Sequence, residues 1–198
     1  MRITVFIGLT MILAASSYAA TITMTHTGVG SGQIGSTSFT NAAFTITDIA
    51  DTTNRQLIGT AYFINDNSAS IAITGLGTFN FTTATRTYVS NGGQIVGFSR
   101  SGSAGADLFS GPQSTLFTTW DMLSSIGPVS GTGSLFQWAL SQVNTNAGVL
   151  TFNDGSSNTV FTAGIGGTTV PEPSSLISIG TSLIGLAGLA WRRRKSVG

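Results

Sequence analysis

Between Ala20 and Val170 the chain contains neither Lys nor Glu, and this gap in composition restricts what it can fold into. The same stretch holds 27 Thr, 18 Ser and 21 Gly, so the residues that favour surface helices are nearly missing. Thr, Phe, Ile and Val, which favour strands, are plentiful. The composition therefore predicts an all-β fold for residues 20–170, which we call the body.

Short segments of the body alternate apolar and hydroxylic residues, the pattern of half-buried strands. Ile22 and Met24 lie between threonines, and Ile71 and Ile73 repeat the pattern. Turn-forming residues separate these segments at intervals of about ten residues: Asn65–Asn67, Gly75, Asn91–Gly93, Gly111–Pro112, Gly127–Pro128, Gly131–Gly133 and Asn153–Gly155. This spacing predicts one antiparallel β-sandwich or jelly-roll-like domain with a short helix at Thr119–Ser125.

The chain contains no cysteine, so its fold has no disulfide bonds and depends on the packing of its core. Large aromatic side chains are available for this core. Residues at alternating positions are expected inside rather than stacked on sugars at the surface. The predicted core comprises Phe44, Ile46, Ile58, Phe63, Ile73, Phe79, Phe81, Val96, Phe98, Leu116, Phe136, Trp138, Leu140, Leu150, Phe152 and Phe161.

The C-terminal segment, residues 171–198, combines three elements in order. Pro171, Glu172 and Pro173 come first, and the two prolines favour an exposed extended spacer. Residues 176–191 follow without a charge and would span roughly 24 Å as a helix, marginally enough to cross a bilayer core of about 30 Å. Arg192, Arg193, Arg194 and Lys195 then form a basic stop, which predicts a cytoplasmic C-terminus with the body outside.

The N-terminal segment predicts export as well. Residues 1–19 combine Arg2, an apolar stretch and the small-x-small sequence Ser17-Tyr18-Ala19, as a signal peptide does. Cleavage is expected between Ala19 and Ala20. The precursor would then be tethered to the inner membrane by its C-terminal segment.

Residues 171–198 resemble the bacterial PEP-CTERM sorting signal, which is processed by a membrane enzyme called exosortase. The resemblance implies that Pro171, Glu172 and Pro173 form the recognition motif, residues 176–191 a transient membrane span, and Arg192 to Arg194 the basic stop. It further implies a Gram-negative host that makes exopolysaccharide. The mature protein would be released or transferred into the envelope or matrix. The resemblance says nothing directly about the body.

The body offers few groups for nucleic-acid binding or catalysis. It contains six Asp and three Arg residues, which give a net charge of −3 without a basic stripe for nucleic acid. His26 is the one histidine and is expected on the surface of the first strand, and no Gly-x-Ser-x-Gly sequence accompanies it. Gly30–Gly35 matches the dinucleotide fingerprint literally, but alternating residues follow where a helix is required, so we expect a flexible glycine loop. These observations argue against an enzyme.

Two oxygen-rich segments, Asp48–Asn54 and Asn65–Asn67, are candidate loops for Ca²⁺. Their carboxylates belong to Asp48, Asp51 and Asp66. Asp and Asn in turns usually bond their own backbone, so the sequence requires no cofactor or metal.

Two classes of function agree with these features. The first is an exported structural or interaction protein on the envelope or in the extracellular polymer, associated with exopolysaccharide. Without Lys at its sheet edges, such a protein is open to pairing with copies of itself. The alternative is a carbohydrate-binding module for an extracellular polysaccharide. A secreted hydrolase with paired Asp residues is the weakest alternative.

Overall fold

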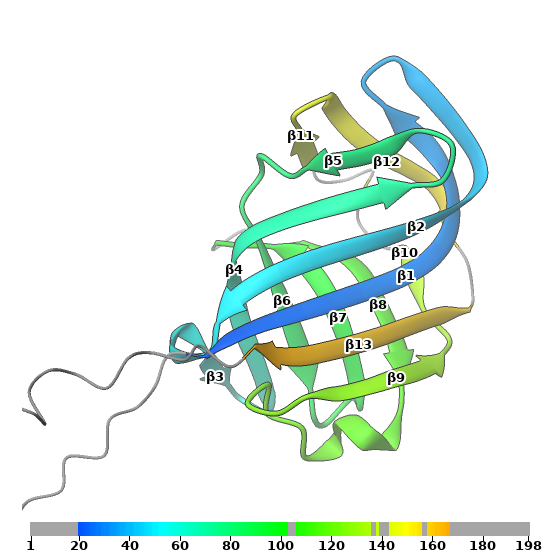
Figure 1. Ribbon diagram of the computed structural model, residues 1–198. Coiled ribbons are helices and arrows are strands. Elements are labelled where there is room, and N and C mark those ends of the chain that lie inside the picture. The colour runs from blue at the N-terminus through cyan, green and yellow to red at the C-terminus, as the bar shows by residue number, and fades with distance from the viewer. Residues whose placement is uncertain (1–19, 103–105, 136–137, 139–142, 156–157, 167–198) are drawn as a thin grey trace, which may run out of the picture. The chain divides into compact units, whose positions relative to one another are not determined.

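Two long strands, β1 (Thr21–Ile34) and β2 (Thr37–Asp51), form the centre of the structure and pair along most of their length (Figure 1). The computed structural model describes residues 20–102, 106–135, 138, 143–155 and 158–166. These residues all belong to one compact unit that ends at Gly166. The predicted signal peptide and the C-terminal segment lie outside the described residues.

Antiparallel pairing joins the described strands into one curled sheet, ordered β10-β8-β7-β6-β4-β2-β1-β12-β11, with β13 and β9 continuing beside the first half of β1. The remaining elements are η1 (Thr52–Asn54), β3 (Gln56–Ile58), β4 (Ala61–Ile73), β5 (Gly77–Asn80), β6 (Thr85–Ser90), β7 (Ile95–Arg100), β8 (Asp107–Gln113), η2 (Thr115–Thr118), β9 (Ile126–Gly131), β10 (Ser134–Leu135), β11 (Val143–Thr145), β12 (Gly148–Gly155) and β13 (Thr159–Gly166). The prediction of an all-β antiparallel fold is confirmed. The described strands form one continuous curled sheet in place of the two separate sheets of a sandwich.

The strand β4 bends where its alternation of buried side chains shifts by one position. Ile64 is buried in its first half, and Ala69, Ile71 and Ile73 are buried in its second half. The pairing of β2 with β4 skips a residue at the same place, which marks a β-bulge. Asn65–Asn67, predicted as a turn, therefore lies within a strand, because a bulge uses the same tolerant residues as a turn does.

Glycines in β1 make room for aromatic rings. A Cβ atom on Gly28 would lie 2.8 Å from the Phe44 ring, and one on Gly30 would lie 2.8 Å from the Phe152 ring. The expected flexible loop over Gly30–Gly35 is wrong, because β1 continues to Ile34 and only then turns. The glycines belong to a strand on which rings pack closely.

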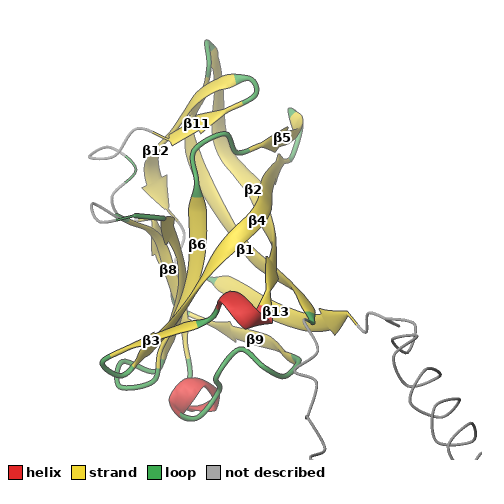
Figure 2. Cartoon of the chain, turned by 90° about the vertical axis from the view of Figure 1, so that its left-hand side faces the viewer, coloured by secondary structure: helices red, strands yellow, loops and turns green. Residues whose placement is uncertain are grey.

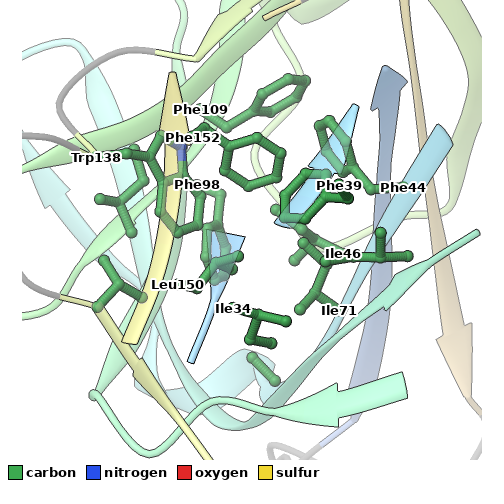
Figure 3. Packing of buried hydrophobic residues seen from close by; sticks show 14 residues of the cluster. Ile34, Phe39, Phe44, Ile46, Ile71, Phe98, Phe109, Trp138, Leu150 and Phe152 are labelled. Carbon is green, nitrogen blue, oxygen red and sulfur yellow. The ribbon is translucent and has the colours of Figure 1, made fainter. Parts of the chain in front are cut away.

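The curled sheet encloses two groups of buried side chains. Figure 3 shows the first group, in which Phe44, Phe98, Phe109, Trp138 and Phe152 approach one another. The second group surrounds Phe161 and includes residues of η2 and the segment that follows it. Of the predicted core, nine members are confirmed as buried: Phe44, Ile46, Ile73, Val96, Phe98, Trp138, Leu150, Phe152 and Phe161.

Other members of the predicted core lie elsewhere. Phe79 and Phe81 are partly buried and pack against the first group, and Phe63 is partly buried. The prediction is wrong for Ile58 and Leu116, whose surfaces are 58% and 59% exposed because they lie on the short β3 and η2. Phe136 and Leu140 fall outside the described residues.

The helix expected at Thr119–Ser125 is wrong. The backbone there is irregular, and a one-turn 3-10 helix precedes it at Thr115–Thr118. The Trp120 side chain is buried and donates from Nε1 to the Ser124 carbonyl at 2.9 Å, which closes this segment as a loop.

Candidate functional site

His26 lies inside the curled sheet, where its side chain is fully buried. Its imidazole is surrounded by the rings of Phe98, Phe109 and Phe161, at centroid distances of 6.2, 5.7 and 4.8 Å. The prediction of a surface residue is wrong. His26 shares the inward side of β1 with Ile22 and Met24, so the alternation that predicted the strand also indicates the burial of the histidine.

Asp48 on β2 is the neighbour of His26 and is also fully buried. The Thr87 hydroxyl on β6 donates a 2.6 Å hydrogen bond to its Oδ2. The distance from Asp48 Oδ1 to His26 Nε2 is 3.9 Å, which is too long for a hydrogen bond. One carboxylate oxygen of Asp48 and both imidazole nitrogens of His26 are therefore buried without a hydrogen-bond partner in the structure.

Asp66 on β4 completes this buried polar cluster of His26, Asp48, Asp66 and Thr87. Both of its carboxyl oxygens are buried, and it lies close enough to Asp48 for its charge to raise the pKa of Asp48. The Thr85 hydroxyl and the Thr87 amide lie near enough to Asp66 to lower its pKa, but neither makes a hydrogen bond of good geometry. The cluster thus joins side chains from four strands that are neighbours in the sheet order.

Burial shifts the pKa values of the cluster toward uncharged side chains. It lowers the pKa of His26 from 6.5 to about 3. It raises the pKa of Asp48 well above its ordinary value, and the negative charge of Asp66 adds to this effect. Burial also raises the pKa of Asp66 to about 7. A neutral imidazole and protonated carboxyl groups avoid the large cost of placing charges in an apolar interior.

Two surface pockets lie beside Asp66. One, of about 330 Å³, is lined by Thr53, Asn54, Arg55, Gln56, Asn65, Asp66 and Asn67. The other, of about 220 Å³, runs between β4 and the segment before β6 and includes Phe81 and Thr85. Both are shallow depressions lined mainly by small polar side chains.

The three calcium candidates do not form a common site. Asp48 and Asp66 face each other inside the sheet, whereas Asp51 is partly exposed at the end of β2, where it caps η1. There its Oδ1 accepts from the amide of Thr53 at 2.8 Å and from the hydroxyl at 2.7 Å, and these hydrogen bonds lower its pKa. The expectation that both segments are loops is wrong, since Asp48 and Asp66 belong to strands. Within the described part of the chain, no three His, Cys, Asp or Glu residues are grouped to hold a metal ion.

The innermost side chains of the cluster are closed off from solvent. Its histidine and its Asp48 carboxyl have no exposed surface. Sequence reasoning missed Thr87, which is one of many threonines and whose role depends on the pairing of β4 with β6.

The residues predicted for sorting fall outside the described part of the chain. They are Ala19, Pro171, Glu172, Pro173, Arg192, Arg193, Arg194 and Lys195, together with the apolar run 176–191. Ala20, at the expected cleavage site, is described and exchanges hydrogen bonds with Thr52. In the part of the chain that the structure describes, we find no helix with the length and apolar character needed to cross a membrane.

Comparison with known proteins addresses the C-terminal segment. The family model of the PEP-CTERM protein-sorting motif matches residues 169–195. No curated protein and no solved structure matches the chain. The resemblance recognised from Pro171, Glu172, Pro173 and the residues after them is thereby confirmed, and no family is assigned to the body. Residues 169–195 are therefore a PEP-CTERM protein-sorting motif, which implies an exported protein that is sorted through the membrane and processed by exosortase.

Proposed function

We propose that the chain is an exported, non-enzymatic protein whose body is delivered to the cell envelope or the extracellular matrix after exosortase processes its C-terminal signal. The match of residues 169–195 to the sorting motif carries this proposal. The last strand, β13, ends at Gly166, before the matched segment begins. Removal of the signal would leave every described strand intact, as is required if the body is to remain folded after processing.

The proposed topology places the body outside the cytoplasm. Residues 1–19 act as a cleaved signal peptide, residues 176–191 span the inner membrane, and the basic residues after them remain in the cytoplasm. The first described strand begins at Thr21, so cleavage between Ala19 and Ala20 would remove none of the sheet. The precursor is a tethered intermediate, and the mature form is released or attached to the envelope.

A non-enzymatic role is supported by the position of the one histidine. Catalysis by His26 with Asp48 would require a substrate to reach side chains that have no exposed surface. The body then acts through its surface, by association with exopolysaccharide or with copies of itself. The carbohydrate-binding alternative stays a prediction, and a glycan array probed with the mature protein is its test.

The proposal is tested by replacing Pro171, Glu172 and Pro173 together with alanine in the producing bacterium. Cell fractionation and intact-mass analysis then compare the variant with the parent chain. The parent should lose residues 1–19 and the apolar segment, whereas the variant should accumulate in the inner membrane with its C-terminal segment intact. Alanine at both Ser174 and Ser175, beside the motif, is the matched control and should be processed normally. Normal release of the triple variant would refute the proposal.

A further inference from the structure

Four large apolar side chains at one end of the sheet are exposed to solvent. Leu57 and Ile58 on β3 are each 58% exposed, Leu116 on η2 is 59% exposed, and Leu123 in the loop after it is 48% exposed. The described residues include one other exposed large apolar side chain, Ile49, at 37%. We call the four side chains the apolar end.

Hydrogen bonds hold the segments of the apolar end together. Arg55, two residues before Leu57, donates from Nη1 to the carbonyl and to Oδ2 of Asp121, at 2.7 and 2.8 Å. The Asn91 side chain donates from Nδ2 to the carbonyls of Phe117 and Trp120. The backbone amide of Asn91 donates to the carbonyl of Thr60, in the turn after β3. Figures 1 and 2 both place β3 and the segment around η2 at the lower end of the sheet.

The chain also enters and leaves the sheet at this end. Thr21, at the start of β1, pairs with Gly166, at the end of β13. The amide of Thr52 in η1 donates to the carbonyl of Ala20, and β3 follows η1 after one residue. Nine residues, 167–175, separate Gly166 from the apolar run that begins at Leu176. Even fully extended they reach only about 35 Å, so a chain anchored by that run keeps this end of the sheet close to the bilayer.

We propose that the apolar end docks on the surface of the lipid bilayer while the chain is tethered by its C-terminal segment. This inference rests on the proposed function, because it requires the apolar run at residues 176–191 to sit in the membrane. Leucine and isoleucine side chains enter the boundary between headgroups and acyl chains, as the apolar faces of interfacial proteins do. The tether supplies a high effective concentration, so a small contact is sufficient.

Lipid fits this surface better than a second copy of the chain does. Four partly exposed side chains cover far less than the roughly 800 Å² per partner that a stable protein interface buries. Arg55 and Asp121 neutralise each other, with 25% and 36% of their side chains exposed. Docking should therefore occur on zwitterionic phosphatidylcholine, which has no net charge, and depend little on salt, unlike the binding of a basic patch.

The absence of cysteine allows a direct test with a single introduced thiol. The full chain carrying Leu123→Cys is labelled with a polarity-sensitive fluorophore and reconstituted in phosphatidylcholine vesicles that contain headgroup-level nitroxide lipids. Ser38→Cys, exposed on β2 next to the β1–β2 turn, is the matched control. We expect blue-shifted emission and several-fold stronger quenching at position 123 than at position 38. Equal quenching at the two positions would overturn the proposal.

A second variant separates docking from labelling artefacts. Leu57→Ser with Ile58→Ser, added to the labelled chain, should lower the ratio of docked to undocked chain by about tenfold for each residue. Leu57→Met with Ile58→Val keeps the apolar surface and should leave the ratio unchanged. Energy transfer between differently labelled chains that rises with their density, without lipid quenching, would identify a second copy as the occupant and refute lipid docking. Carbonate extraction distinguishes failure of the proposed membrane tether from failure of docking. A chain that is stripped from the vesicles refutes the tether, and a chain that is retained without quenching refutes docking alone.

Discussion

The buried polar cluster should make the protein most stable in mildly acidic solution. Asp66, with a folded pKa of about 7, and Asp48, whose pKa is also raised, stabilise the folded state at low pH and lose this contribution as the pH rises. His26, with a folded pKa of about 3, stabilises the folded state above 6.5 and loses this contribution as the pH falls. The two carboxyl groups therefore act in the same direction, and the histidine opposes them.

Counting protons gives the net slope between pH 5 and 6. The folded cluster holds two protons, on Asp48 and Asp66, because burial keeps His26 neutral. The unfolded chain holds one, on His26. One excess proton in the folded state lowers the free energy of unfolding by about 1.4 kcal/mol for each unit of rising pH. Asp48→Asn should abolish the slope, while it keeps an acceptor for the Thr87 hydroxyl, and His26→Phe should double it.

The measurement is urea unfolding of residues 20–170 at pH 5.0, 5.5 and 6.0, followed by tryptophan fluorescence. Asp107→Asn is the control, because burial raises the pKa of Asp107 but this carboxyl lies outside the cluster. It should change the slope far less than Asp48→Asn does. A parent protein whose stability rises with pH over this range, or a slope that survives Asp48→Asn, would show that the cluster does not hold its protons as argued.

Two substitutions test the packing of the sheet. Gly30→Ala places a Cβ atom 2.8 Å from the Phe152 ring and should cost about 1–3 kcal/mol in thermal or urea unfolding, whereas Gly164→Ala meets open space and should change stability by less than about 1 kcal/mol. Equal losses would contradict the close approach of ring and strand. Thr87→Val removes the hydrogen bond to the β2 carboxylate and should cost about 1–3 kcal/mol, against little change for Val at the exposed Thr78. An unchanged stability of the Thr87→Val variant would mean that the Asp48 carboxyl finds another partner.

Alternation predicted the strands and their buried faces where the strands are regular. Ile22 and Met24 are fully buried as their spacing indicates, and Ile71 and Ile73 follow the same rule in the second half of β4. The same alternation also predicts an interior position for His26, two residues after Met24. Its polar character argued for the surface, but the structure surrounds it with aromatic rings from strands that are distant in sequence.

Four of the predicted turns lie within strands: Asn65–Asn67 in β4, Gly111–Pro112 in β8, Gly127–Pro128 in β9 and Asn153–Gly155 in β12. The two Gly-Pro pairs share one cause. The pairing of β8 with β7 and of β9 with β13 skips residues at these points, so each Gly-Pro pair occupies a β-bulge. Because a proline without a backbone donor suits both a turn and a bulge, local sequence does not distinguish them.

The grouping of Asp48 with Asp66 could not be predicted from the local sequence pattern. Their approach depends on the order in which β2, β4 and β6 pair. The sorting motif needed no such information, since its recognition rests on three consecutive segments of sequence rather than on a fold.

The pairing of β1 with β13 ties the completion of the fold to the end of export. Thr21 and Gly166, the outermost pair of this ladder, stand at opposite ends of the described sequence. A chain that emerges with its N-terminus first leaves the first half of one edge of β1 without its partner until β13 has crossed the membrane, and pairings this distant in sequence form slowly. The enzyme that processes the signal would then meet a body whose outermost strand pair, Thr21 with Gly166, has formed last.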